Sequence, residues 1–169
     1  MRTMSLRRTR VCAAGLLVVA SLVSVVPYVV RRTERAHCAD NLKAVGCAIV
    51  MYSEWANGYP WNPADLIPER MTRRSLRLLM CPATHRHESD VPDGRDWGDY
   101  TYMWWSRYYG TPNEVPWDYP LLYDRALSNH GERGVNILRV GGDVLWDPDA
   151  TWLRDFAASH PQYDIPVPN

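Results

Sequence analysis

The feature that most constrains this chain of 169 residues is an uncharged stretch of twenty residues near its start, Val11 to Val30. At 1.5 Å per residue it would form about 30 Å of helix, the thickness of a bilayer's hydrocarbon core. A secretory signal usually has a shorter apolar region that ends in small residues, whereas this stretch ends in Tyr28-Val29-Val30. We favour a retained single-pass transmembrane helix over residues 11–30, with a cleaved signal peptide as the alternative.

Charge is sorted along the chain, although 19 Lys+Arg and 19 Asp+Glu cancel to a net charge of zero. Residues 1–35 carry seven arginines and one acid, and residues 36–169 carry twelve bases and eighteen acids. The balance speaks against a generic nucleic-acid binder. Because the basic tip 1–10 outweighs the arginines after the span, the positive-inside rule places the N-terminus in the cytoplasm and the C-terminal body outside.

Residues 31–57 are predicted to continue the helix as an amphipathic segment. Asn57-Gly58 is typical of a helix end, and Pro60 follows it. One apolar stripe with steps of three and four residues needs a partner surface, and it is formed by Cys38, Leu42, Val45, Ile49, Tyr52 and Ala56.

The body from 58 to 160 has the pattern of an antiparallel sheet. Aromatic or apolar runs predict strands at 100–105 and 120–124. Gly141-Gly142, between 135–140 and 143–146, predicts a hairpin. The expected fold class is α+β, a long helix packed on a small sheet.

Two features close the chain. Asp147 and Asp149 are predicted to cap a short helix from Ala150 to Ser159. The proline-containing end, 161–169, is expected to form a flexible tail.

An ordered set of short motifs resembles the bacterial prepilin-type family whose C-terminal signature is His, nine residues, then Asp-Gly. The set runs over nearly the whole chain. Its members are Cys38, Asn41, Leu42, Lys43, Gly46, Met51, Tyr52, Asn57, Gly58, Tyr59, Cys81, Pro82, His130, Gly131, Gly134, Asn136, Leu138, Gly142, Val144 and Trp146.

The resemblance implies a type IV pilin-like fold in a protein of the bacterial inner membrane. It implies a non-catalytic structural subunit of a type II secretion (pseudopilin) or type IV pilus-like system. Its partners would be the membrane, other pilin-like subunits and secretion-system proteins. The alternative is an anchored extracytoplasmic module that binds carbohydrate or a protein through aromatic side chains, and a zinc-dependent enzyme is a third hypothesis.

The chain departs from the family at the prepilin peptidase site, where the segment is Ser5-Leu6-Arg7-Arg8-Thr9-Arg10. Ser5 replaces the usual glycine, and Arg10 replaces the glutamate thought to pair with a neighbouring subunit's amine. If the protein polymerises, this reversal of charge favours a capping or minor subunit.

Cysteine pairing is open at the level of sequence. Cys38 lies on the stripe and Cys81 lies before the sheet, so a disulfide would tie helix to sheet, and two buried free thiols are the alternative. Cys81, His85 and His87 could approach a zinc ion, although a solvated loop explains the two histidines more simply.

Three further sets of residues are candidate sites, and none leads to a catalytic, cofactor or metal assignment. Asp143, Asp147 and Asp149 are acids that could bind calcium, but helix capping explains them better. The ring of His130 is expected to bond the backbone of the hairpin turn and so fix the register of the next strand. A general-base role is less favoured, because the sequence shows no nucleophile and no orienting acid to accompany it. The aromatic cluster offers a binding surface formed by Tyr102, Trp104, Trp105 and Tyr108.

Overall fold

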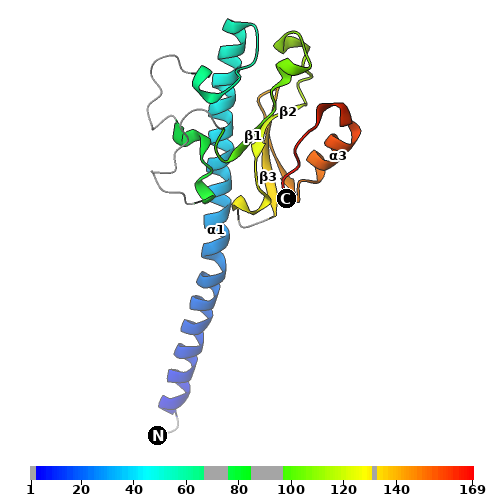
Figure 1. Cartoon of the computed structure of the whole chain (residues 1–169). Coiled ribbons are helices and arrows are strands. Elements are labelled where there is room, and N and C mark those ends of the chain that lie inside the picture. Colours follow the sequence, from blue (N-terminus) through cyan, green and yellow to red (C-terminus); the bar gives the residue numbers. More distant parts are fainter. Residues whose placement is uncertain (1–2, 67–75, 85–96, 131–132) are drawn as a thin grey trace. The chain divides into compact units, whose positions relative to one another are not determined.

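The computed structural model has an α+β fold in which a long helix packs on a four-stranded antiparallel sheet (Figure 1). The structure describes the backbone of residues 3–66, 76–84, 97–130 and 133–169, and their side chains except those of 3–22 and Ser24. The main elements are α1 (Thr3–Ala56), β1 (Tyr100–Tyr102), β2 (Pro120–Asp124), β3 (Gly134–Arg139), β4 (Val144–Pro148) and α3 (Thr151–Ser159). Short 3-10 helices connect them, among them η2 (Arg77–Leu79), η3 (Pro82–Thr84), η5 (Trp105–Arg107), η7 (Leu127–His130) and η8 (Pro161–Tyr163).

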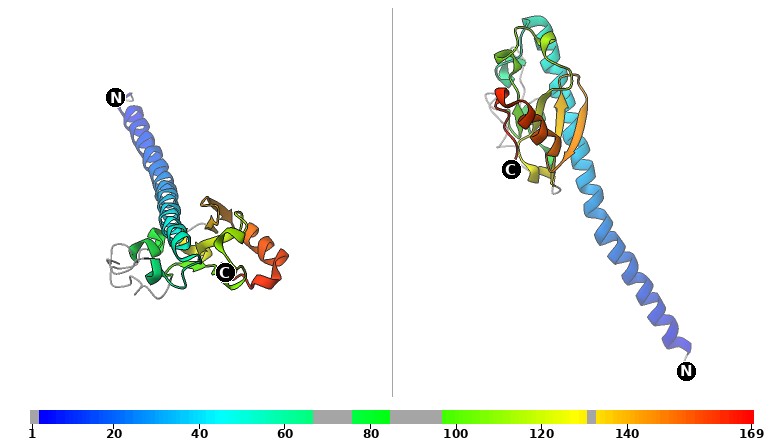
Figure 2. Two further views of the ribbon diagram at one scale, coloured as in Figure 1. Left: turned by 90° about the horizontal axis from the view of Figure 1, so that it is seen from above. Right: turned by 90° about the vertical axis from the view of Figure 1, so that its right-hand side faces the viewer.

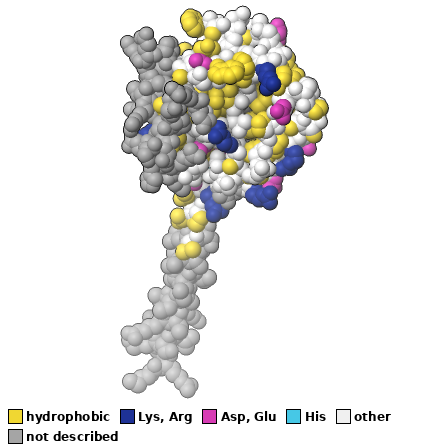
Figure 3. All heavy atoms as spheres, in the orientation of Figure 1, with side chains coloured by type: hydrophobic (Ala, Val, Ile, Leu, Met, Phe, Trp, Pro, Cys, Tyr) yellow, Lys and Arg dark blue, Asp and Glu magenta, His cyan; other side chains and the backbone are white. Residues whose placement is uncertain are grey.

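The chain divides into two compact units, Met1–Thr33 and Glu34–Asn169. The first unit is the N-terminal part of α1 and contains Pro27. Its described apolar side chains are exposed by 47–67%: Val23, Val25, Val26, Tyr28, Val29 and Val30. Figure 3 shows apolar side chains on the surface of this stretch.

Among the residues whose side chains are described, no helix is long and apolar enough to cross a membrane. Most of the predicted span 11–30 has side chains outside that set, and so has the segment 5–10 that resembles the peptidase site. The predicted membrane helix therefore stays a prediction.

In the second unit, α1 buries the predicted stripe against the sheet. Cys38, Leu42 and Ile49 are fully buried and Val45 is nearly so, because this face meets the apolar face of β2 and β3. The stripe ends earlier than expected, since Tyr52 is half-buried and Ala56 is exposed. The predicted helix end is confirmed, because α1 stops at Ala56 and Asn57 takes a left-handed φ of 52°.

Close contact between α1 and β3 depends on a glycine. A Cβ built on Gly46 would lie 2.5 Å from Cδ2 of Leu138, which is itself buried. Gly46 therefore lets the helix approach the sheet more closely than any larger residue would allow.

The strands follow one another in the order β1-β2-β3-β4, all antiparallel. The views in Figures 1 and 2 show the second part of α1 on one face of the sheet and α3 on the other. Both faces are thus covered, which explains why every residue of β2 is buried.

The predicted hairpin is confirmed. Gly142 has a φ of 90°, and the Arg139 amide donates to the Asp143 carbonyl at 2.9 Å. The predicted strand 100–105 is only partly present, because β1 ends at Tyr102 and the chain turns into η5. This turn places the Trp105 indole inside the core, where Nε1 donates to the Pro120 carbonyl at 2.8 Å.

The C-terminal helix α3 is confirmed within one residue of its predicted start. The predicted cap at Asp147 is also confirmed, since its carboxylate accepts the amides of Trp152 and Leu153, each at 2.9 Å. Asp149 does not cap the helix through its side chain and instead pairs with Arg133.

The segment 161–169, which the sequence predicts as a flexible tail, packs on the sheet domain in this structure. The Tyr108 hydroxyl donates to the Tyr163 carbonyl at 2.8 Å, and the Tyr123 hydroxyl donates to the Pro166 carbonyl at 2.6 Å. Ile165 is buried. Tyrosines of the core hold the tail through backbone carbonyls that composition does not reveal.

Candidate metal centre

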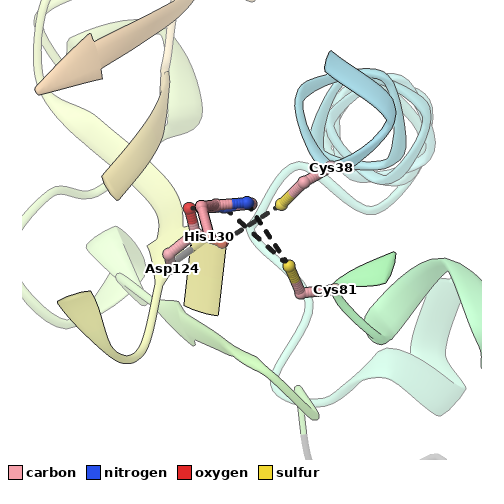
Figure 4. A group of neighbouring side chains, drawn as sticks. All are labelled: Cys38, Cys81, Asp124 and His130. Carbon is pink, nitrogen blue, oxygen red and sulfur yellow. Dashed lines mark hydrogen bonds and ion pairs between the residues drawn. The ribbon is translucent and has the colours of Figure 1, made fainter. Parts of the chain in front are cut away.

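Four side chains that can bind metal converge beneath α1 (Figure 4). Cys38 comes from α1, Cys81 from the link between η2 and η3, Asp124 from the last position of β2, and His130 from the last position of η7. Their ligand atoms all lie within 4.8 Å of one another, and all four residues are buried. Within the described residues, this is the one such group.

The distances define a tight cluster. Cys38 Sγ donates to Asp124 Oδ1 at 3.1 Å, and Asp124 Oδ2 lies 2.9 Å from His130 Nε2. Cys81 Sγ lies 3.8 Å from Nε2 and 4.0 Å from Nδ1 of the same ring. Figure 4 shows the ring nitrogens of His130 turned toward the two cysteines. Cys38 and Cys81 are free thiols, so the structure brings the predicted pair together without a disulfide.

Neighbouring groups hold each ligand in place. The backbone amide of Asn136 donates to Asp124 Oδ2 at 2.6 Å, and its side-chain Nδ2 lies 3.2 Å from His130 Nε2. The Tyr100 hydroxyl lies 3.4 Å from Cys38 Sγ. These contacts orient three of the four ligands.

The fourth ligand, Cys81, is positioned by two polar side chains. Asp99 accepts the Cys81 amide at 2.9 Å and the Thr84 hydroxyl at 3.0 Å. Asn41 of α1 donates to the Met80 carbonyl at 3.2 Å. The turn that carries Cys81 is thereby attached both to the helix and to the segment before β1.

Contacts within the cluster shift the pKa values of three of its residues. Hydrogen bonding with Cys38 lowers the pKa of Cys81 to about 6, against the opposing effect of burial. Hydrogen bonding with Cys81, followed by burial, raises the pKa of Cys38 far above its usual range. Burial lowers the pKa of His130, but hydrogen bonds to Asp124 and Cys81 outweigh it and raise the pKa to about 9. At neutral pH these pKa shifts favour a thiolate at Cys81 beside a protonated His130.

The cluster contains the residue types of a catalytic triad, in which a cysteine is the nucleophile, a histidine is the base and an aspartate orients the histidine. In such a relay the histidine uses one ring nitrogen for the nucleophile and the other for the acid. Here Nε2 is the nearer nitrogen to both Asp124 and Cys81. Cys81 is only 2% exposed and His130 only 1%, so a substrate has no access. The arrangement fits an ion or a covalent link between the sulfurs better than it fits catalysis.

Comparisons with family models, curated proteins and solved structures give no match.

Only one member of the predicted zinc group lies within the described residues. Cys81 belongs to the cluster, whereas His85 and His87 lie outside the described residues. The acids weighed for calcium are engaged separately: Asp143 pairs with Arg139, Asp147 caps α3 and Asp149 pairs with Arg133. Each carboxylate already has a partner of its own.

The prediction that His130 bonds the hairpin backbone is corrected by the structure. Its ring contacts the side chains of Asp124, Asn136 and Cys81 instead. The reason is that η7 turns the ring inward, under α1, rather than toward the Gly141-Gly142 turn.

The predicted aromatic surface is also revised. Trp105 is fully buried and belongs to the core, because its ring packs among those of Tyr119 and Tyr163. Tyr102, Trp104 and Tyr108 are half-buried and line a pocket of about 200 Å³. Small-molecule sites usually measure about 300–1,000 Å³, so this pocket is smaller than such a site.

Sequence reasoning missed Asp124 as a site residue. Its signal was an aspartate that ends an otherwise apolar strand, Pro120-Leu121-Leu122-Tyr123, six residues before His130. A carboxylate next to a fully buried strand needs a buried partner, and that requirement could have identified it.

Proposed function

We propose that this protein is a membrane-anchored, non-catalytic structural subunit of the pilin or pseudopilin type, acting in a type II secretion or type IV pilus-like system. The observation that carries the proposal is the difference in burial between the two parts of α1. Cys38, Leu42 and Ile49 are buried against an antiparallel sheet, while the described valines in the first unit of the same helix are exposed.

The described valines of the first unit form an exposed apolar cluster. Five of them, Val23, Val25, Val26, Val29 and Val30, are 47–67% exposed within eight positions. Clustered apolar surface of this kind marks contact with lipid or with another protein. The uncharged sequence 11–30 and the arginines on both sides favour lipid.

In this role the anchor holds the protein in the inner membrane while the sheet domain presents an outer surface to partners. Helices of neighbouring subunits would pack side by side through the first unit. Arg10, in place of the pilin glutamate, favours a capping or minor position. The closed, buried cluster under α1 supports a role without catalysis.

The test is made on the full chain expressed in a Gram-negative host. We expect it to stay with membranes after alkaline carbonate extraction, and we expect protease added to spheroplasts to digest the sheet domain. Intact mass then reports processing: a chain that starts at Leu6 supports pilin maturation, and an intact Met1 excludes that route. Recovery of a soluble chain cleaved near residue 30 would overturn the anchor.

Assembly needs its own measurement. Cross-linking in membranes that contain the cognate secretion or pilus proteins should trap the chain with a second copy or with another pilin-like subunit. Trapping of neither, in membranes where a known pilin of the same system is trapped, would contradict the structural role.

A further inference from the structure

We propose that Cys38, Cys81, Asp124 and His130 bind one zinc ion that fastens α1 to the sheet. The four donors are two sulfurs, one imidazole nitrogen and one carboxylate oxygen, all within 4.8 Å of one another. The inference does not depend on the proposed function, because it concerns how the second unit is held together.

The spacing suits a tetrahedral ion. Zinc bonds of about 2.0–2.3 Å to nitrogen, oxygen and sulfur place neighbouring ligands about 3.3–3.8 Å apart. The ring nitrogen of His130 lies 2.9 Å from Asp124 and 3.8 Å from Cys81, and Cys38 lies 3.1 Å from Asp124. Small side-chain rotations bring these donors around one centre.

Zinc also engages the Asp124 carboxylate and the His130 imidazole, which a disulfide between the two cysteines would not use. A bridge between Cys38 and Cys81 would remove the thiol proton that Cys38 now donates to Asp124 Oδ1. That oxygen would then lose a donor inside a residue that is 0% exposed. Burying a carboxylate with fewer partners is costly. An ion takes up the thiols, the carboxylate and the imidazole at once.

Binding of the ion changes the protonation of the site. Zn²⁺ displaces the thiol proton of Cys38 and one ring proton of His130, and both protons leave to solvent, while Cys81 binds as a thiolate and Asp124 as a carboxylate. The site then carries one surplus negative charge. The Asn136 amide at 2.6 Å from Asp124 and the Tyr100 hydroxyl at 3.4 Å from Cys38 offset it, as outer groups around metal ligands commonly do.

Four protein ligands leave no open position on a tetrahedral ion, so the site is structural and not catalytic. It joins α1, the link between η2 and η3, the end of β2 and the end of η7. Removal of the ion is therefore expected to loosen the docking of α1 on the sheet rather than to melt the helix itself.

The experiment uses the full chain extracted in mild detergent with a phosphine reductant and without chelators. Elemental analysis should find one zinc per chain. After exchange, Co²⁺ should give the strong visible bands of tetrahedral cobalt and near-ultraviolet thiolate charge-transfer bands. Because the cobalt spectrum is measured on the unmutated chain, the proposal stays testable even if a ligand variant fails to fold.

Single substitutions test which residues bind the zinc ion. Cys38→Ser, Cys81→Ser and His130→Ala should each lose most of the zinc and lower the thermal midpoint. Cys47→Ser is the matched control, since Cys47 lies on the same helix and is exposed; it should keep one zinc and an unchanged midpoint. Equal zinc content in Cys38→Ser and in the unmutated chain would overturn the proposal.

The disulfide is tested in the same material. Free thiols are alkylated in intact cells before lysis, and peptides are mapped without reduction. Unbridged Cys38 and Cys81, together with one bound zinc per chain, support the zinc site. A Cys38–Cys81 cystine in the cell, or no bound ion after dialysis against zinc, would overturn it. Loss of the membrane anchor in the earlier test would leave this outcome untouched.

Discussion

Asp99 shows how one buried carboxylate can organise a turn. It is 4% exposed, and it accepts the Cys81 amide and the Thr84 hydroxyl while its own amide donates to the Leu79 carbonyl at 2.9 Å. Hydrogen bonds to a charged acceptor are each worth about 1.5–3 kcal/mol. The position of Cys81 therefore depends on a residue that contributes no ligand.

We predict that Asp99→Ala lowers the free energy of unfolding by about 1.5–3 kcal/mol, because the Cys81 amide loses its acceptor. Denaturant unfolding of the full chain in detergent measures it. Asp143→Ala is the control, since its carboxylate serves a partly exposed pair with Arg139, and its effect should stay below about 1 kcal/mol. Equal losses in the two variants would contradict the positioning role of Asp99.

Tyr59 gives a prediction in pH. Burial raises the pKa of its phenol from 10 to about 12. Its stabilising contribution is complete below pH 10, and it is lost as pH rises from 10 through 12, because the unfolded phenol ionises first. Circular dichroism should show that the free energy of unfolding falls as pH rises through this window, and tyrosinate absorbance should report the ionisation of the phenols at the same time. Tyr59→Phe should reduce that dependence, and an identical pH profile in the variant would refute it.

At the scale of elements, the helix and the sheet meet where Gly46 faces Leu138. Overpacking costs about 1–3 kcal/mol, and alanine gains about 0.5–1 kcal/mol over glycine in a helix. We predict that Gly46→Ala destabilises the chain by about 1 kcal/mol alone, but stabilises it in a Leu138→Ala background, where its Cβ has room.

A double-mutant cycle by denaturant unfolding measures this change of sign. Leu138→Ala alone should cost about 2–5 kcal/mol, because it leaves a cavity. Additive effects of the two substitutions would show that Gly46 is not a site of close contact.

The start of α3 offers a second element-level prediction. Asp147→Ala should cost about 1 kcal/mol, because the amides of Trp152 and Leu153 lose their acceptor. Asp155→Ala, at an exposed position of the same helix, should change stability by less than about 0.5 kcal/mol. Thermal unfolding compares the two, and an Asp147→Ala effect as small as that of Asp155→Ala would refute the cap.

At the scale of the whole molecule, two units of different character share one helix. The first exposes valines, and the second has a core that includes Leu42, Leu122 and Ile137. Acidic residues in a membrane span cost about 2.5–3.5 kcal/mol each near its centre. The double substitution of Val23 and Val26 by Asp should therefore release the chain from membranes at alkaline pH while its thermal midpoint stays unchanged.

The matched control substitutes Val50 and Met51 by Asp, since both are exposed apolar residues of the second unit. This variant should remain in the membrane fraction. Retention of the Val23/Val26 variant, or release of both, would argue against a lipid-covered first unit.

The local elements could be predicted from sequence because their causes are local. The steps from Cys38 to Ile49 are those of a helix face, Asn57-Gly58 is a helix end, and Gly141-Gly142 is a hairpin turn. Each of these was found where it was expected. The shortened β1 and the packed tail were missed, because distant partners decide them: Pro120 binds the Trp105 indole and Tyr123 binds Pro166.

The sequence by itself determined the amphipathic helix, its end, the hairpin and the cap of α3, since neighbouring residues settle hydrogen bonding and periodicity. It also placed Cys38 on the buried face. Only the tertiary structure decided that Cys38 meets Cys81, Asp124 and His130. Those four lie on separate elements, and their approach depends on the register of β2 against β3 and on the close packing of α1 at Gly46. Such distances arise from packing between elements, which no short-range pattern encodes.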